Sequence, residues 1–253
     1  MSNSCSNPQS KHQTTSLTSK VSSRVSDSLA GWHMEGLTGL AKRLLPAGMW
    51  HGQTAKREIE LIDDPIYGGT HEIHLTFDDG PNPDTTPYLL ELFEEEGVKA
   101  TFFVIGNQVE KNEDLVLEVS RKGHALGNHT YSHQFLPILS AKKMEKEILT
   151  TNQRIKEITG NDPVLFRPPF GIVDKKAHAL LLEQGMKTVY WSAFSEDWKR
   201  IGERSVVERL SKYAVPGGIM IMHELEPKQT IAAARSLIRK LKQENYNFSA
   251  ITH

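Results

Sequence analysis

Short apolar runs alternate with longer amphipathic segments from residue 71 onward. Seven runs rich in β-branched and aromatic residues predict strands, at residues 73–77, 101–105, 124–127, 164–167, 188–191, 219–222 and 248–251. Between them, apolar positions recur at helical spacing near residues 85–96, 108–121, 140–159, 174–184, 204–213 and 229–244. Strands that alternate with helices of this length predict βαβ units and a parallel sheet, so the fold class is α/β. Seven strands favour a barrel-like closure over a short open sheet.

The first seventy residues have a different pattern. Thirteen of residues 1–30 are serine or threonine, a composition that cannot bury a core, so we expect a disordered tail there. Residues 31–70 are predicted to hold an amphipathic helix and a lead-in segment, because leucines recur at helical spacing from Leu37 to Leu45. We favour packing of this stripe on its own domain, with peripheral membrane contact by residues 31–45 as the alternative. Residues 71–253 then form one domain.

Composition excludes several classes of protein. The 253 residues are 38% hydrophobic and 24% charged, which is ordinary for a chain that buries a core. The formal net charge of −1 gives no reason to expect a nucleic-acid partner. Cys5 is the single cysteine, so no internal disulfide is expected. No apolar run is long enough for a transmembrane segment or a signal peptide, so we expect a cytoplasmic or non-classically exported protein. Nothing in the pattern indicates an oligomeric state.

Residue types that are common in active sites lie where the predicted strands end. In chain order they are Asp78, Asp79, His129, His133, Arg167, Asp197, Trp198 and His223. The carboxyl ends of the strands in a parallel α/β barrel share one face, so these side chains are expected to meet in one pocket.

Two histidines and an aspartate predict a metal site. His129 and His133 are four residues apart in HTYSH, so in a helical turn they would face the same way. With Asp79 they form a three-ligand set with open positions, as in catalytic zinc or non-haem iron sites. Asp78 would then be a free carboxylate placed to take a proton from an activated water. The plain alternatives are two surface histidines and a pair of aspartates that cap a turn.

The remaining residues have functional and structural interpretations. Arg167, in FRPPFG, could hold the base by a bidentate pair or form a structural salt bridge. Two prolines there lack N–H groups, so the first free amide belongs to Phe170 and could face a developing oxyanion. His223 could be a general acid or a satisfied structural residue. Trp198 could form an apolar wall for a small acyl methyl group or pack in the core.

Five motifs in this order, TFDDG, HTYSH, RPPFG, EDW and IMIMH, resemble those of the polysaccharide deacetylases, carbohydrate esterase family 4 with its NodB-homology domain. The resemblance covers about residues 71–253. It implies a deformed (β/α) barrel and a divalent metal, with Zn²⁺ expected and Co²⁺ or Ni²⁺ as alternatives. It also implies hydrolysis of acetyl groups on sugars. The implied roles are Asp78 as base, Asp79, His129 and His133 as metal ligands, Arg167 as the residue that orients the base, His223 as acid, and Phe170, Asp197 and Trp198 at the substrate.

Two positions depart from the family pattern. The fourth motif usually opens with an aspartate, thought to support the catalytic histidine, where this chain has Phe194. An apolar ring there would lower the pKa of His223 unless Asp197, Glu196 or Glu224 takes over. The third motif often has tyrosine at the position of Phe170.

Three functional hypotheses therefore stand. The first is a metal-dependent deacetylase acting on peptidoglycan N-acetylglucosamine or N-acetylmuramic acid, chitin oligomers or acetylxylan. The second is a catalytically impaired carbohydrate-binding relative, motivated by Phe194. The third is a 2-His-1-carboxylate iron oxygenase, which the same ligand set permits.

Overall fold

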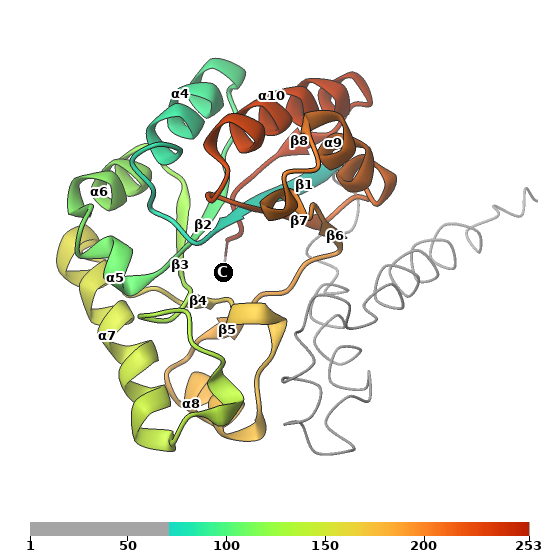
Figure 1. Cartoon of the computed structure of the whole chain (residues 1–253). Helices are drawn as coiled ribbons and strands as arrows, with labels where there is room; N and C mark the ends of the chain where they lie inside the picture. The colour runs from blue at the N-terminus through green and yellow to red at the C-terminus, as the bar shows by residue number, and fades with distance from the viewer. Residues whose placement is uncertain (1–70, 253) are drawn as a thin grey trace, which may run out of the picture. The chain divides into compact units, whose positions relative to one another are not determined.

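The computed structural model describes residues 71–252 (Figure 1). The predicted tail over residues 1–30, and the predicted helix and lead-in segment over 31–70, lie outside the described residues. The membrane contact predicted for residues 31–45 is therefore not addressed by the structure.

Within the described residues, eight strands form one sheet in which every pair is parallel. They are β1 (Glu72–Asp78), β2 (Thr101–Val104), β3 (Ala125–Asn128), β4 (Leu165–Phe166), β5 (Lys187–Thr188), β6 (Ala193–Phe194), β7 (Gly218–His223) and β8 (Asn247–Phe248). The order is β5-β4-β3-β2-β1-β7-β6, and β8 pairs with the start of β1. This incomplete α/β barrel confirms the predicted fold class.

Helices follow the strands and surround the sheet (Figure 1). Among residues 71–252 these are α4 (Thr86–Glu96), α5 (Gly106–Val109), α6 (Glu113–Arg121), α7 (Ala141–Thr159), α8 (Lys175–Glu183), α9 (Glu203–Lys212) and α10 (Pro227–Gln243). Three short 3₁₀ turns lie in the strand-to-helix connections, η2 (Leu136–Ile138), η3 (Pro169–Gly171) and η4 (Asp197–Lys199). All six predicted helical segments are present, with residues 108–121 covered by α5 and α6.

The central strand β1 has two faces of different character. Ile73, Leu75 and Phe77 pack in the main apolar core, where the Phe77 ring lies 5.5 Å from Phe93 of α4. Successive side chains of a strand point to opposite faces, so Thr76 and Asp78 point the other way. Both are buried and both hydrogen bond to Arg167 in the interior of the barrel. The alternation along β1 thus places apolar side chains against the helices and polar side chains at the site.

The shortest strands differ from prediction. Strand β6 was not predicted, and β5 and β8 are each two residues long and begin before the predicted runs at 188–191 and 248–251. Two residues carry no periodicity, so neither the alternation of β1 nor the long apolar run of β7 can be recognised in them.

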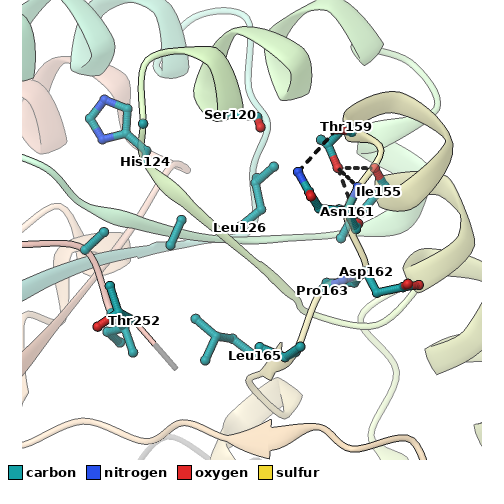
Figure 2. Close-up of a pocket in the computed structure, with 15 residues that line it drawn as sticks. Ser120, His124, Leu126, Ile155, Thr159, Asn161, Asp162, Pro163, Leu165 and Thr252 are labelled. Carbon is teal, nitrogen blue, oxygen red and sulfur yellow. Dashed lines mark hydrogen bonds between the residues drawn. The ribbon is translucent and has the colours of Figure 1, made fainter.

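A cavity lies at the opposite end of the strands from their carboxyl ends. It has a volume of about 350 Å³ and is lined where β3 and β4 begin and where the chain leaves β8 (Figure 2). His124, Asn161 and Asp162 are among the residues that line it. None of the predicted site residues lines it. In the part of the chain that the structure describes, no helix combines the length and the apolar character that crossing a membrane requires.

Candidate active site

The carboxyl ends of four strands bring the predicted site residues together. Asp78 ends β1 and is paired in register with His223, which ends β7. His129 directly follows β3, and Arg167 directly follows β4. These segments are separated in sequence by up to 145 positions, yet they are neighbours because the sheet is parallel.

Asp79, His129 and His133 form a cluster suited to a metal ion. One ligand atom from each lies within 4.8 Å of the others. Asp79 Oδ1 is 3.6 Å from His129 Nε2 and 3.4 Å from His133 Nε2. That oxygen is buried and has no hydrogen-bond partner among the described residues. An orphaned carboxylate oxygen between two imidazoles fits a divalent cation, because the cation would supply the missing partner.

The protonation of His129 also suits a ligand. Its Nδ1–H donates to the carbonyl of Arg167 at 2.7 Å, which leaves Nε2 with its lone pair toward Asp79. Burial lowers the pKa of His129 to about 3, so the ring is neutral at pH 7. A neutral imidazole oriented by a hydrogen bond to its other nitrogen is the usual form of a metal ligand.

The prediction that His129 and His133 lie in a helical turn is wrong. They belong to a loop in which Thr130 and His133 have left-handed φ values of +66° and +54°. Asn128 Oδ1 accepts the N–H of Thr130 at 2.6 Å, and Thr130 Oγ1 accepts the N–H of His133 at 3.1 Å. These side chains replace the helical hydrogen bonds, and the two rings still come within 4.9 Å of each other.

Asp78 lies beside this cluster with one oxygen engaged. Its Oδ1 accepts from Arg167 Nη1 at 2.8 Å, and its Oδ2 lies 3.7 Å from His129 Nε2. The side chain is 2% exposed, and burial raises the pKa of Asp78 against the opposing charge of Arg167. A buried carboxylate with one oxygen held by a cation and the other facing the cluster can accept a proton there.

Arg167 is held on all sides. It is fully buried, and it donates to the carbonyl of Val189 at 3.1 Å, to that of Tyr190 at 3.1 Å and to Thr76 Oγ1 at 2.7 Å. Its guanidinium lies 4.0 Å from the centre of the Phe103 ring. These contacts fix the position of the charge that faces Asp78.

His223 is supported by a buried aspartate on the other side of the site. Its Nδ1–H donates to Asp197 Oδ1 at 2.8 Å, and its backbone N–H donates to Asp197 Oδ2 at 2.7 Å. Burial lowers the pKa of His223, but the hydrogen bond and the charge of Asp197 outweigh it, so the pKa is raised. The ring is therefore suited to carry a proton at neutral pH.

Comparison with known proteins connects this geometry to a family. Residues 67–189 match the family model described as polysaccharide deacetylase. The chain is 36% identical over 184 residues to a peptidoglycan-N-acetylglucosamine deacetylase of Bacillus cereus, an alignment that covers 71% of this chain and 86% of that protein. The chain belongs to the polysaccharide deacetylase family. The resemblance of the five motifs is thus confirmed.

Solved structures agree with this assignment. A crystal structure of a peptidoglycan N-acetylglucosamine deacetylase superimposes with a TM-score of 0.70 at 29% identity, covering 72% of this chain and 87% of that one. A family 4 pseudoenzyme from Bacillus anthracis superimposes with a TM-score of 0.68 at 27% identity, covering 72% and 64%. The deacetylase PgdA of Listeria monocytogenes is also 36% identical to this chain but is longer, and the alignment covers 76% of this chain and 41% of that protein. The fold is shared with a pseudoenzyme, so the site residues of this chain decide its chemistry.

The structure corrects one expectation about the fourth motif and decides another. Asp197 is predicted to bind substrate, whereas it is fully buried behind His223 and also accepts from Ser195 Oγ at 2.7 Å. The pKa of His223 is expected to be lowered beside Phe194 unless another carboxylate takes over, and Asp197 is the one that does, so that pKa is raised. Of the three candidate replacements, Glu196 pairs instead with Lys199 and Arg209, and Glu224 accepts from the hydroxyl of Thr86.

Aromatic side chains border the deacetylase site. Trp198 is half-buried, and its ring lies 4.8 Å from His223 and 4.9 Å from Phe194. Phe170 is 49% exposed with φ of +61°, and its ring lies 4.9 Å from His133. Within residues 71–252 the Phe170 N–H has no hydrogen-bond partner, as required of a donor reserved for a ligand. The roles of Trp198 as pocket wall and of Phe170 as oxyanion donor stay predictions.

One buried carboxylate at the site, Glu147 of α7, was missed from the sequence, and it accepts two hydrogen bonds from Ser132. Glu224, considered from the sequence only as a support for His223, is also buried, and burial raises its pKa to about 8. A signal existed for Glu147, because it falls on the same face of α7 as the buried Met144, Ile148 and Thr151. A charged residue on the apolar face of a helix needs a partner.

Proposed function

We propose that the protein is a metal-dependent hydrolase that removes acetyl groups from N-acetylglucosamine-type sugars of peptidoglycan or chitin oligomers. The observation that carries this proposal is the arrangement around Asp79, His129 and His133, where Asp78 presents a free oxygen and His223 ends the adjacent strand. The naming of the Bacillus cereus relative supports the sugar class.

A divalent metal held by Asp79, His129 and His133, which we expect to be zinc, would polarise the acetyl carbonyl and acidify a water. Asp78 Oδ2 takes the proton of the attacking water, while Arg167 holds Oδ1 and orients the carboxylate. Negative charge then develops on the carbonyl oxygen, where the N–H of Phe170 is a candidate donor.

His223 completes the reaction as general acid. Asp197 fixes its Nδ1–H, so the proton available for transfer is the one on Nε2. Protonation of the departing nitrogen allows the sugar amine to leave with acetate as the other product. The raised pKa of His223 favours the protonated ring that this role requires.

One observation counts against each of the two competing hypotheses. The impaired-relative hypothesis was motivated by Phe194, but Asp197 supplies the contact to His223 that Phe194 cannot. The iron-oxygenase hypothesis rested on the ligand types alone, and the chain belongs to a hydrolase family instead.

Acetate release measures this function directly. The full-length protein, with zinc or with a chelator, is assayed on chitin oligomers, peptidoglycan fragments and acetylxylan. Asp78→Asn should retain metal and lose about a hundredfold or more in turnover, the scale of general-base catalysis. Asp84→Asn is the matched control, because Asp84 is exposed in the same loop. Near-normal turnover of Asp78→Asn, or acetate release unaffected by the chelator, would reject the proposal.

A further inference from the structure

A single buried carboxylate holds the loop between the two histidine ligands. Glu147 projects from α7 and is 8% exposed. Its Oε2 accepts the backbone N–H of Ser132 at 2.7 Å, and its Oε1 accepts the hydroxyl of the same residue at 2.7 Å. Two short bonds from one carboxylate to one residue fix both the position and the orientation of Ser132.

This loop requires external support. Its φ values at Thr130 and His133 are left-handed, which is unfavourable for residues with a Cβ. The carbonyls of Thr130 and Tyr131 are held by N–H groups of Gly106 and Asn107, at 2.9 Å each. Helix α5, which starts at Gly106, lies beside α7 (Figure 1). The first half of the loop is therefore anchored to α5.

Ser132 is the last anchored residue before the second ligand. Its partner is on α7, whereas the N–H of His133 reaches only Thr130 Oγ1, within the loop itself. The position of His133 relative to the domain thus depends on Ser132. Loss of the Glu147 contact would remove this anchor directly before His133, whose ring lies 3.4 Å from Asp79 Oδ1, and would leave the chain to be held next at the buried Leu136.

Burying a carboxylate is costly, and Glu147 has no cationic partner in the described part of the chain. An apolar residue at this position of α7 would pack with Met144 and Ile148 without that cost. The two acceptor oxygens of Glu147 instead match two donors of the ligand loop, the N–H and the hydroxyl of Ser132.

We propose that Glu147 is a positioning residue for the metal centre, acting through Ser132 to hold His133 at the distance from Asp79 that a shared cation requires. This inference rests on the proposed metal site at Asp79, His129 and His133. It assigns part of the metal affinity to a residue that touches neither the metal nor the substrate.

Cobalt(II) is the probe, because its visible absorption reports both affinity and ligand geometry. The full-length protein is stripped with a chelator and titrated with Co²⁺ well below its unfolding temperature. Glu147→Ala should weaken Co²⁺ binding about tenfold to a hundredfold, the usual range for partners outside the ligand set, and should alter the absorption bands. Ser132→Ala removes one of the two bonds and should weaken binding severalfold. Glu145→Gln is the matched control, exposed on the same helix, and should bind as the wild type does.

The possible outcomes separate this role from a purely structural one. A purely structural Glu147 would lower the unfolding temperature of the metal-free protein and leave Co²⁺ affinity and spectrum unchanged, which would overturn the inference. If Glu147→Ala does not fold, Ser132→Ala decides, and wild-type affinity in that variant would overturn it. Wild-type protein that bound no Co²⁺ would reject the metal site itself, and this role with it.

Discussion

Replacement of Arg167 should show how much its charge stabilises the buried carboxylate of Asp78. Arg167 and Asp78 form an ion pair of 2.8 Å with both side chains almost fully buried. Arg167→Met keeps most of the side-chain volume and deletes the charge. Taking one partner from a buried pair costs about 3–5 kcal/mol, because the remaining charge is left uncompensated away from water. The carbonyls of Val189 and Tyr190 also lose their donor.

The charge contribution can be separated by a double-mutant cycle with Asp78→Asn. Arg167→Met/Asp78→Asn has no buried charge at this pair, so it should be less destabilised than the sum of the single variants. We expect the difference to be about 2–3 kcal/mol, near the upper range for residues in direct contact. Urea unfolding in the presence of a chelator, followed by tryptophan fluorescence, measures all four proteins without a contribution from bound metal.

The pH dependence gives an independent check. Burial raises the pKa of Asp78, and Arg167 opposes that rise, so Arg167→Met should raise the pKa further. A carboxyl group whose pKa is higher in the folded state destabilises the fold at neutral pH, and the penalty is relieved as pH falls below the folded pKa. The free energy of unfolding of Arg167→Met should therefore rise relative to that of Arg167→Met/Asp78→Asn when the pH is lowered mildly. This account would be refuted if Arg167→Met lowered the free energy of unfolding by the same amount in the wild type and in Asp78→Asn, at neutral and at acidic pH.

Two further predictions concern the acid and the sheet. Asp197→Asn removes the charge that raises the pKa of His223. The alkaline limb of the pH profile of kcat/KM should therefore move to lower pH. An unmoved limb would show that Asp197 does not set this pKa. Gly127→Ala would place a Cβ 2.4 Å from the Phe103 ring, which lies against Arg167. Thermal unfolding should show that the variant is less stable than the wild type by about 1–3 kcal/mol. Unchanged stability would show that this ring can move aside.

The long periodic elements and the location of the site were predictable from the sequence. Strand β1 alternates over seven residues, and β7 is an apolar run that ends at His223. Because parallel strands end at one edge, placing Asp78 and His223 side by side required only strand assignments and the rule of parallel packing. Elements of this length carry enough periodicity to be identified without knowledge of their neighbours.

The conformations that depend on distant partners were not predictable. The loop from His129 to His133 is shaped by Asn128 and by Glu147, which lies fourteen residues beyond His133 on another element. The orientation of Asp197 likewise depends on β7, because its carboxylate meets both the ring and the backbone N–H of His223. Hydrogen bonds of this kind are decided by tertiary packing, so the local sequence can indicate that a buried carboxylate needs a partner but does not specify which donor it meets.

The two adjacent aspartates can serve one site because the backbone turns between them. Neighbouring side chains of a strand point to opposite faces, so regular extension would send Asp79 away from Asp78. The strand ends at Asp78, and Asp79 has φ of +73°, a left-handed value that aspartate tolerates better than most residues. The turn directs both carboxylates to the same pocket, where their partners differ. Asp78 is neutralised by a permanent cation, Arg167, whereas Asp79 faces two imidazoles, one of which burial keeps neutral. A cation bound at Asp79 would therefore relieve the repulsion that remains between the two carboxylates.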